Sequence, residues 1–570
     1  MRKGSYLIII FFIFLVLFIV TAASFVYIGI GKAPSIKANS YLEISLGGEL
    51  VEKSSPDILS SFYLRPTALS MYDIWTNFQK AKNDTRIKGV VLRLGYLVCD
   101  WAKINEIRDL VTDFRQSGKK VYAYVSESIE FDKEYYLATA CDKIVLHPQG
   151  MLVINGIGGY VPFVKQTLDK LGIEAEVEHV EEYKTAYHMF TKQGMTPAHR
   201  EMLDAIYKSI YSQYVETVAG ARSKTPDEIR ELLDHGFFQG EQAKEAGLVD
   251  ALLYEDQFQD LLLDDQKRIH TISHNQYLKT RPASYGFDKG KKIALIYGTG
   301  TIVSGEGMYS MMGSATISRQ IRRARKDRSI AAIVLRVDSP GGSAVASDTI
   351  WREVTLAKIE KPFIVSMSDL AGSGGYQIAM AAHKIVAHPQ TLTGSIGVIF
   401  TKLNLTNLYD KLGITSERIQ YGKRADMFTT FRSATPEERA MLRQEILRMY
   451  DHFVTKAAEG RNLSKDDIQR VAKGRVWTGS QALDHGLVDE MGGLSRAIAL
   501  AKELAGIPEK DSVSLQVWPK KVSFFDMMMG RRVAKFDLGL EPRMQKVLFT
   551  FQLLRNEAPW ALMPFWLPHD

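Results

Sequence analysis

The sequence has 570 residues, of which 46% are hydrophobic and 24% are charged, and its formal net charge is +7. This composition is typical of a globular protein with several large cores, and it excludes a wholly disordered, a collagen-like and a disulfide-stapled chain. The small basic excess is spread along the chain, so no nucleic-acid partner is expected.

The first predicted element is a membrane-spanning helix at the N-terminus. Arg2 and Lys3 precede an uncharged apolar run over residues 6–30, which exceeds the ~20 helical residues that a bilayer requires. The preceding positive charges favour a cytoplasmic N-terminus, so the body is expected on the extracytoplasmic side. Small residues at 21–23 would suit signal-peptidase cleavage, but the apolar run continues beyond them, which favours an uncleaved anchor over residues 1–31.

An internal duplication organises the rest of the chain. Two blocks recur at an offset of 241 residues and a third at an offset of 239, far longer than a solenoid period, which indicates two copies of a whole domain. The matching blocks are residues 142–148 (DKIVLHP) with 383–389 (HKIVAHP), 170–173 with 411–414 (both KLGI), and 247–250 with 486–489 (both GLVD). We expect a first copy at residues 41–285, a polar linker at 284–291, a second copy at 292–506 and a C-terminal tail at 507–570.

Each copy is predicted to alternate strands and helices. In the second copy, short apolar runs predict strands at residues 292–297, 331–337 and 362–367, and helical spacing predicts helices at 318–325 and 346–358. This alternation predicts an α/β fold in which each copy has a largely parallel sheet with flanking helices. For the tail, a membrane-surface helix, a partner helix, core packing and an oligomer contact are all open.

The chain has two cysteines, Cys99 and Cys141. Two buried thiols are favoured over a disulfide between them, and two cysteines do not indicate a redox compartment.

The candidate nucleophile is Ser373, in the second copy. It lies in residues 369–376 (DLAGSGGY), between a predicted strand and the helix-like residues 377–382. Glycines on both sides of the serine allow a tight turn that exposes its hydroxyl, and free N–H groups at a helix start favour a developing oxyanion. A helix N-cap serine in a close-packed turn would give the same pattern.

A second glycine-rich segment, residues 338–343 (DSPGGS), also follows a predicted strand. Because sites in α/β folds lie at the carboxyl edge of the sheet, this segment is expected beside Ser373. One of its bare N–H groups and that of Gly374 would form a two-donor oxyanion hole, whereas the plainer interpretation is a proline-glycine turn. The corresponding stretches of the first copy, residues 95–98 and 130–133, lack both segments, and turn geometry alone does not explain their joint absence.

These features resemble the signal peptide peptidase A (protease IV) family in its long two-domain form, within the ClpP/crotonase-like fold. The resemblance rests on residues 338–342, 373–376 (SGGY), 391–397 (TLTGSIG) and 183–186 (YKTA), together with the duplication and the anchor. It implies a serine endopeptidase without a cofactor. Its substrates would be hydrophobic peptides such as cleaved signal peptides, and it would be a homotetramer in the inner membrane with its body on the periplasmic side.

The resemblance also assigns the site residues. It implies Ser373 as the nucleophile and Lys184 as the base, so the site would be split between the copies. It further implies that Ser395 orients the lysine and that Gly342, or else Gly341, joins Gly374 in the oxyanion hole.

A lysine base must be neutral, because an ammonium cannot accept a proton. Lys184 must therefore be buried, and the neighbouring Glu181 and Glu182 must point away from it. Lys423 of the second copy aligns with Lys184 at the offset of 239 and is the alternative base.

Other chemistries are less well supported. His383 or His388 would be the base of a histidine triad, but both lie in the repeated strand block, which favours structural roles. No metal-binding motif occurs, so no metal is expected. A crotonase-type acyl-transfer enzyme and a non-catalytic membrane scaffold are the alternative functions, and an outward-facing body would meet little CoA.

Overall fold

The computed structural model describes residues 17, 34–53, 69–125, 129–264, 266–280, 289–307, 311–519 and 560–562. The predicted anchor over residues 1–31 lies outside these ranges apart from residue 17, as does most of the predicted linker. Within the described ranges, no helix is both long enough and apolar enough to cross a bilayer.

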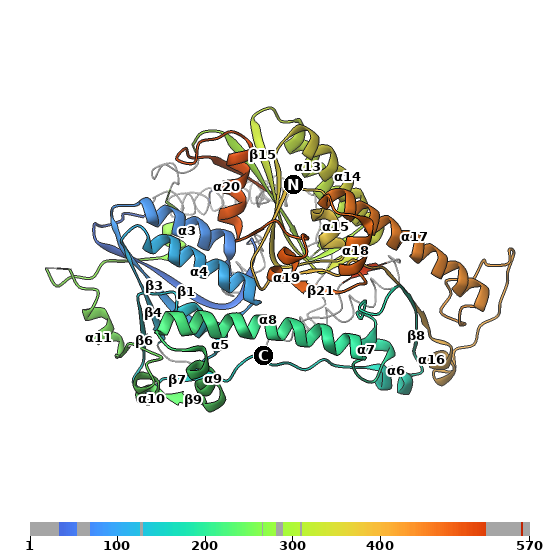
Figure 1. Ribbon diagram of the computed structural model, residues 1–570, viewed down its shortest axis with the longest axis horizontal. Helices are drawn as coiled ribbons and strands as arrows, with labels where there is room; N and C mark the ends of the chain where they lie inside the picture. Colours follow the sequence, from blue (N-terminus) through green and yellow to red (C-terminus); the bar gives the residue numbers. More distant parts are fainter. Residues whose placement is uncertain are drawn as a thin grey trace, which may run out of the picture.

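The first copy is built on a parallel sheet. Helices α3 (Met71–Asn83) and α4 (Trp101–Arg115) connect its strands and pack against it (Figure 1). The strand order is β10 (Ala251–Leu252), β6 (Lys143–Leu146), β4 (Lys120–Val125), β3 (Ile87–Val98), β1 (Ser40–Val51) and β11 (Thr271–Ser273), with β2 (Leu69–Ser70) beside the end of β1. Every pairing in this sheet is parallel, as the alternation of strands and helices predicts.

The second copy repeats this plan. Its sheet has the order β21 (Val476–Thr478), β19 (Leu392–Gly394), β17 (Phe363–Gly372), β15 (Ile330–Ser339), β12 (Lys292–Thr299) and β23 (Ser514–Trp518), with β18 (Lys384–Ala387) beside β17 and β22 (Glu490–Met491) beside β18. All of its pairings are parallel except that of β19 with β21. The predicted α/β fold with largely parallel sheets is therefore confirmed.

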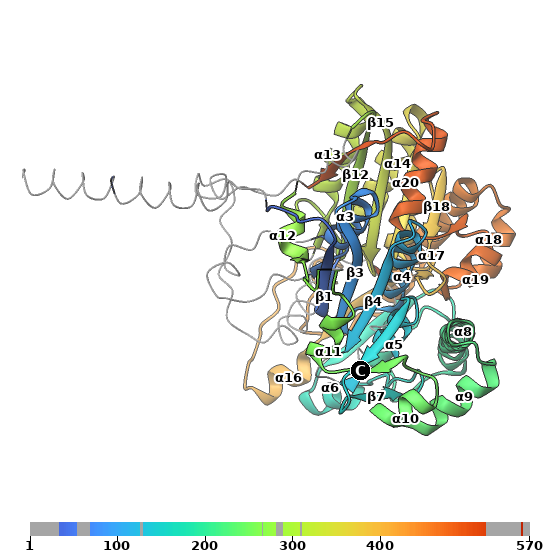
Figure 2. The ribbon, with the colours of Figure 1, turned by 90° about the vertical axis from the view of Figure 1, so that its left-hand side faces the viewer.

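The second sheet is buried on both faces, each by a different part of the chain. One face packs against α13 (Ser314–Lys326) and α14 (Ala344–Glu360) of its own copy. The other face packs against α20 (Leu494–Leu504) and α4, and its apolar side chains join those of the first copy in one continuous core. Figure 2 shows α4 and α20 near each other between the two sheets. The two copies are thus packed into a single body.

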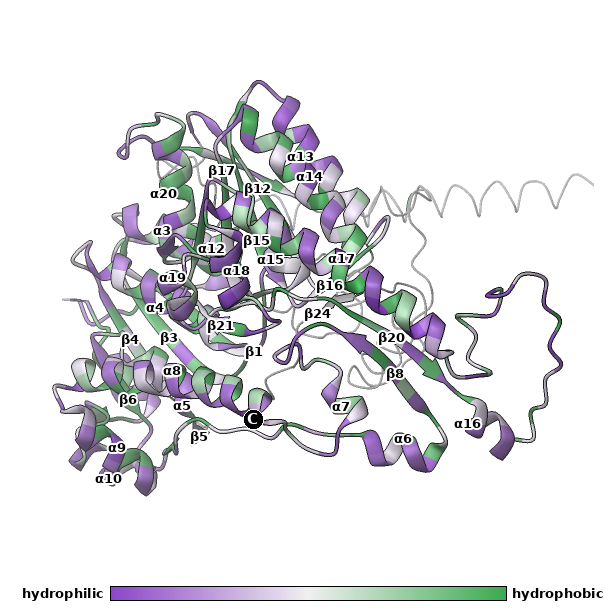
Figure 3. Ribbon diagram, turned by 45° about the vertical axis from the view of Figure 1, so that its right-hand side comes forward, coloured by the Kyte–Doolittle hydropathy of each residue, from purple (hydrophilic) through white to green (hydrophobic). Residues whose placement is uncertain are grey.

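A third sheet crosses the boundary between the copies. Strand β8 (Glu174–His179) of the first copy pairs antiparallel with β20 (Ile399–Asn404) of the second, and the pair extends away from both main sheets (Figure 3). The long helix α8 (Pro197–Arg222) also reaches both copies, since Ser209 Oγ lies 3.1 Å from Thr478 Oγ1. These connections bring residues after β8 to the second sheet.

Part of the tail belongs to the fold. Strand β23 extends the second sheet alongside β12, and Trp518 is buried in its core, so core packing is the role of this part. Strand β24 (Trp560–Leu562) pairs antiparallel with β16 (Gly341–Ser343) and contacts β20. Cys99 and Cys141 are both free thiols, as expected, and Cys99 is buried whereas Cys141 is half-buried.

Strands β13 (Thr301–Val303) and β14 (Met311–Gly313) complete the third sheet, and β5 (Ile129–Glu130), β7 (Met151–Ile154) and β9 (Gly236–Gln239) form a small sheet of their own. The other helices are α5 (Asp132–Ala138), α6 (Lys165–Leu171), α7 (His188–Thr191), α9 (Pro226–His235), α10 (Gly240–Glu245), α11 (Glu255–Asp260), α12 (His274–Leu278), α15 (Gly374–Ala379), α16 (Thr406–Lys411), α17 (Pro436–Arg461), α18 (Lys465–Val471) and α19 (Gly479–Asp484).

Candidate active site

Ser373 lies on a strained turn between β17 and α15. Its backbone has φ 53° and ψ −111°, a conformation that a residue with a side chain rarely adopts. Such strain persists only where the surroundings impose it, and it is frequent at functional sites. The next turn of chain is packed tightly, because a side-chain carbon on Gly375 would lie 2.8 Å from the Ser339 carbonyl oxygen. Ser373 is fully buried in this arrangement.

The second glycine-rich segment lies beside this turn, as the sequence predicted. A side-chain carbon on Gly374 would lie 3.2 Å from the Gly342 nitrogen, so the backbones of these two glycines are in close contact. Gly342 itself has no room for a side chain, since its Cβ would lie 2.1 Å from the Ile302 carbonyl oxygen. The N–H of Gly341 donates to Ser339 Oγ at 3.2 Å. Because the Gly342 nitrogen is the backbone nitrogen of this segment that lies nearest the Gly374 Cβ position, the geometry favours Gly342 over Gly341 as the partner of Gly374.

Lys184 comes from the other copy and reaches Ser373. It follows β8, whose pairing with β20 carries the chain to the second sheet. Its Nζ lies 2.7 Å from Ser373 Oγ, and it is 3.0 Å from both the carbonyl oxygen and the Oγ of Ser395. The structure thus brings Ser373, Lys184 and Ser395 together, and Lys184 and Ser373 come from different copies.

The surroundings of Lys184 favour the neutral amine. The residue is 0% exposed, and burial lowers its pKa well below 10.5. No carboxylate opposes this effect: Glu182 is exposed and lies 3.6 Å from Lys473 Nζ. Burial without a counter-charge therefore favours the neutral amine over the ammonium, as a general base requires.

Two glycines of the second copy enclose Lys184. A side-chain carbon on Gly474, whose φ is +78°, would lie 2.4 Å from Lys184 Cβ, and one on Gly397 would lie 3.2 Å from Lys184 Cδ. Tyr183 N–H donates to the Lys473 carbonyl at 3.2 Å, which ties the lysine segment to the same loop. Gly474 was not predicted from the sequence, because a single glycine between Lys473 and Arg475 forms no recognisable motif.

Ser395 has the same unusual backbone as Ser373, with φ 52°. Its N–H donates to the Arg475 carbonyl at 2.7 Å, and the Arg475 guanidinium lies over the Tyr183 ring. This loop therefore fixes both Ser395 and the segment that carries Lys184.

The alternative bases lie elsewhere. Lys423 is exposed in the loop after α16. His383 Nδ1 accepts a hydrogen bond from the Phe363 N–H, and His388 Nδ1 lies 3.8 Å from Asp109 Oδ2, so both have other partners. In the first copy, Asp132 begins α5 at the place that corresponds to the Ser373 turn, and it accepts hydrogen bonds from backbone N–H groups.

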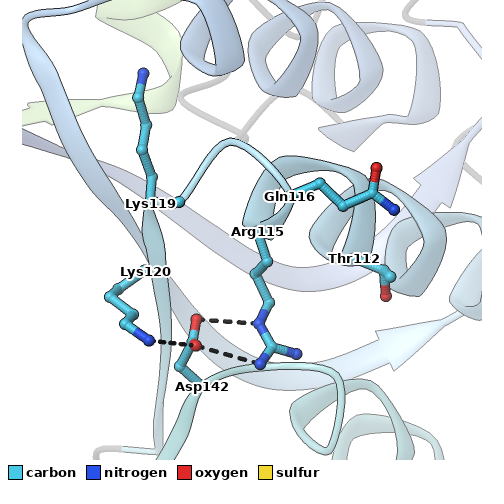
Figure 4. Close-up of a pocket in the computed structure, with 7 residues that line it drawn as sticks. Thr112, Arg115, Gln116, Lys119, Lys120 and Asp142 are labelled. Atoms are coloured by element: carbon cyan, nitrogen blue, oxygen red, sulfur yellow. Dashed lines mark hydrogen bonds and ion pairs between the residues drawn. The ribbon is translucent and has the colours of Figure 1, made fainter.

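A surface pocket of about 390 Å³ lies at the far end of α4 and is lined by Thr112, Arg115, Gln116, Gly118, Lys119, Lys120 and Asp142 (Figure 4). Asp142 forms ion pairs with Arg115 and Lys120 there, and Lys119 donates to the backbone carbonyls of Ala81 and Asp84. None of the predicted site residues lines it. Among the described residues, no group of three or more His, Cys, Asp and Glu side chains could hold a metal ion.

Comparison with known proteins identifies the family. The model of peptidase family S49 matches residues 113–268 and 355–508, one region in each copy. The chain belongs to peptidase family S49. This S49 chain is 37% identical over 491 residues to the chloroplastic serine protease SPPA of Arabidopsis thaliana, which covers 84% of this chain and 71% of that protein.

Bacterial relatives match over still more of their length. Protease 4 of Salmonella typhi is 33% identical over 563 residues, 94% of this chain and 89% of that protein. Protease 4 of Haemophilus influenzae is 32% identical over 77% of this chain and 74% of that protein. The chain is therefore a serine peptidase rather than a crotonase-type acyl-transfer enzyme or a non-catalytic scaffold. A solved ClpP1 mutant from Listeria monocytogenes covers 36% of this chain and 94% of its own at 17% identity, and its TM-score of 0.24 is too low to support a conclusion.

Proposed function

We propose that this S49 peptidase is a membrane-anchored endopeptidase with a Ser-Lys dyad, which hydrolyses hydrophobic peptides such as cleaved signal peptides on the extracytoplasmic side of the inner membrane. The observation that carries the proposal is the 2.7 Å distance between Lys184 Nζ and Ser373 Oγ, inside a site without a carboxylate partner for the lysine.

In the proposed acylation step, neutral Lys184 takes the proton of Ser373 Oγ as this oxygen attacks the peptide carbonyl. The N–H groups of Gly342 and Gly374 donate to the resulting oxyanion. Lys184 then gives the proton to the leaving amine, and the C–N bond breaks. A second cycle, with water as the nucleophile and Lys184 again as the base, releases the carboxylic product and restores Ser373. Ser395, within 3.0 Å of Lys184 Nζ, would orient the amine throughout.

Strand pairing supports the binding of an extended peptide. Strand β24 of the chain's own tail lies antiparallel to β16, with Ala561 opposite Gly342. We propose that a substrate adds to β16 in the same way, which would place its carbonyl near the N–H groups of Gly342 and Gly374. The class of substrate is supported by a relative in Enterococcus faecium named as a putative signal peptide peptidase SppA, 30% identical over 236 residues. The predicted anchor would keep the site close to such apolar peptides.

We propose that the protein forms a homo-oligomer, and the resemblance implies a homotetramer. Two segments that form no strand within the subunit support this proposal. Residues 415–420 and 158–163 correspond, at the offset of 241, to β8 and β20. Both segments are within the described residues and neither forms a strand, and they expose Tyr160 (85%) and Ile419 (87%). Repeating the β8–β20 contact would pair 415–420 of one subunit with 158–163 of the next. Each subunit offers one segment of each kind, so this contact is head-to-tail, and the homotetramer is the proposed case in which four such contacts close a ring.

The proposed activity is tested by incubating the full-length protein, purified in detergent, with a fluorogenic peptide that contains an apolar stretch. We expect hydrolysis by the wild type, covalent labelling by a fluorophosphonate probe, and loss of both in Ser373→Ala with the fold retained by circular dichroism. The matched control is Ser117→Ala, which removes a serine after the far end of α4 whose Oγ donates to the Phe114 carbonyl. Hydrolysis by a folded Ser373→Ala variant at the wild-type rate would refute the nucleophile.

A further inference from the structure

A second buried lysine of the first copy, Lys103, lies between two aspartates of the second copy. Its Nζ is 2.7 Å from Asp338 Oδ2 and 2.7 Å from Asp369 Oδ2. Asp338 directly precedes the segment that carries Gly342, and Asp369 precedes the turn that carries Ser373. The lysine thus joins the bases of the two loops that form the candidate site.

The pairing of β15 with β17 is irregular beside the Lys103 side chain. The pairing of β15 with β17 runs in register to Val337 opposite Met367 and resumes with Ser339 opposite Ala371. Strand β17 therefore has extra residues opposite Asp338, and Asp369 lies within this bulge. The register after the bulge sets how far Ser373 lies from Gly342, because both follow within a few residues. The Lys103 ammonium contacts both sides of this bulge, Asp338 on β15 and Asp369 on β17.

Asp369 also anchors the helix that carries Lys103. Its carboxylate accepts hydrogen bonds from the backbone N–H groups of Asp100 at 3.2 Å and Lys103 at 2.9 Å, at the start of α4. A carboxylate is stabilised at a helix N-terminus by the unpaired N–H groups and the helix dipole. Both the backbone and the side chain of Lys103 are therefore fixed to the nucleophile strand.

The pKa of Lys103 is shifted in the opposite direction from that of Lys184. Although burial alone would lower it, the carboxylates of Asp338, Asp369 and Glu52, the last at 3.8 Å, raise the pKa of Lys103 well above 10.5. Burial and the nearby carboxylate of Asp369 raise the pKa of Asp100 to about 7. The first copy thus supplies one buried lysine whose pKa is lowered, at Ser373, and one whose pKa is raised, between Asp338 and Asp369.

One part of this network, the Asp338 carboxylate, has no counterpart in the first copy. The stretch of the first copy that corresponds to residues 338–341 begins with Gly95, so the first copy has no carboxylate in the place of Asp338.

We propose that Lys103 is a positioning residue for the peptidase reaction, which clamps the Gly342 segment and the Ser373 turn in the register that catalysis requires. This inference rests on the proposed function. It assigns the first copy a second task besides supplying the base, and it makes the oxyanion hole depend on contact between the copies.

The test compares three full-length variants by kcat, KM and the rate of fluorophosphonate labelling per folded molecule. Lys103→Met keeps the length of the side chain but removes its charge, and we expect kcat to fall about 10- to 100-fold with KM within about threefold of the wild type, because a misplacement of about 1 Å has this effect. Lys103→Arg keeps the charge, and we expect it to restore kcat to within about fivefold of the wild type.

Glu106→Gln is the matched control. Glu106 is on the same helix, is equally buried and joins the copies through Arg336 and the Leu494 N–H, but it contacts neither loop. We expect this variant to lower the melting temperature while leaving kcat within about threefold of the wild type, since it weakens contacts between the copies without moving the reacting groups. If Lys103→Met and Glu106→Gln lowered kcat by the same factor, Lys103 would be no more than an interface residue and the proposal would be wrong.

A further variant covers the case in which Lys103→Met does not fold, and the activity of the wild type separates failure of the clamp from failure of the proposed function. If Lys103→Met does not fold, Lys103→Met with Asp338→Asn, which leaves no unpaired carboxylate at 338, is measured instead. A kcat at least tenfold below the wild type supports the clamp, and a wild-type kcat overturns it. A wild type without hydrolysis would refute the proposed function itself, whereas an active wild type with an equally active Lys103→Met would refute only the clamp.

Discussion

Replacing Gly474 by alanine tests how closely the base depends on the second copy. The added carbon would lie 2.4 Å from Lys184 Cβ, where ordinary contact begins at 3.4 Å, so the lysine backbone must move by about 1 Å. Such a shift would lengthen the distance from Lys184 Nζ to Ser373 Oγ from 2.7 Å to about 3.7 Å, beyond hydrogen-bond reach. A misplacement of this size costs about 100-fold in kcat, or about 2.7 kcal/mol in activation free energy.

The assay is the hydrolysis of the apolar fluorogenic peptide, with the free energy of unfolding measured in parallel. Alanine in a left-handed conformation costs about 1–2 kcal/mol of stability wherever it occurs. Gly118→Ala separates this cost from the clash, because Gly118 has φ +81° and nothing within 4 Å of its Cβ position. We expect both variants to lose similar backbone stability, but only Gly474→Ala to lose kcat. If kcat of Gly474→Ala were within about threefold of that of Gly118→Ala, close packing around Lys184 would not control the reaction.

Three other predictions follow from the structure. Burial lowers the pKa of Lys184 well below 10.5, and the neutral amine is the active form, so kcat/KM should rise with pH through this lowered pKa and then level off. A kcat/KM that falls as pH rises over that range would contradict a lysine base. Removal of residues 560–570 should lower KM for the peptide, because β24 pairs with β16 where the substrate would add, and an unchanged KM would show that the two do not compete. The proposed contact between subunits is tested by cross-linking, in a background with Cys99 and Cys141 replaced by serine. Val161 and Glu417 correspond to the opposed residues Lys402 and Glu176, and opposed strand residues have Cα separations that suit a disulfide. A mixture of Val161→Cys and Glu417→Cys chains should therefore form a disulfide-linked pair under oxidation. Neither variant alone should cross-link, and cross-linking of one alone would indicate a two-fold contact instead.

Much of the fold could be predicted from the sequence, since the hydrophobic periodicity that defines the elements is local. The predicted helices at 318–325 and 346–358 lie within α13 and α14. The predicted strand at 362–367 is the first half of β17, which runs on to Gly372 because the later residues pair with β15 and β19 beyond the bulge. Periodicity cannot show a bulge, because the extra residues break the alternation from which a strand is recognised.

The site was predictable where a motif marks it. Ser373 and Gly342 follow strands in glycine-rich segments, and the structure brings them together with Lys184. Gly474 and Lys103 carry no motif, because their roles depend on the contact between copies. That contact arises from the antiparallel pairing of β8 with β20 and from the packing of α4 against the second sheet, which no local pattern in the sequence indicates.

The central claim is that the base and the nucleophile come from different copies, and the rate of fluorophosphonate labelling of Ser373 in Lys184→Ala and Lys423→Ala tests it most directly. Labelling reports on the reactivity of the serine without requiring the natural substrate. We predict that Lys184→Ala labels at least about 100-fold more slowly than the wild type while remaining folded, as expected for loss of a general base. Lys423→Ala, whose lysine is exposed, should label at the wild-type rate. A reactive Ser373 in Lys184→Ala together with an unreactive one in Lys423→Ala would place the whole site in the second copy and contradict the account.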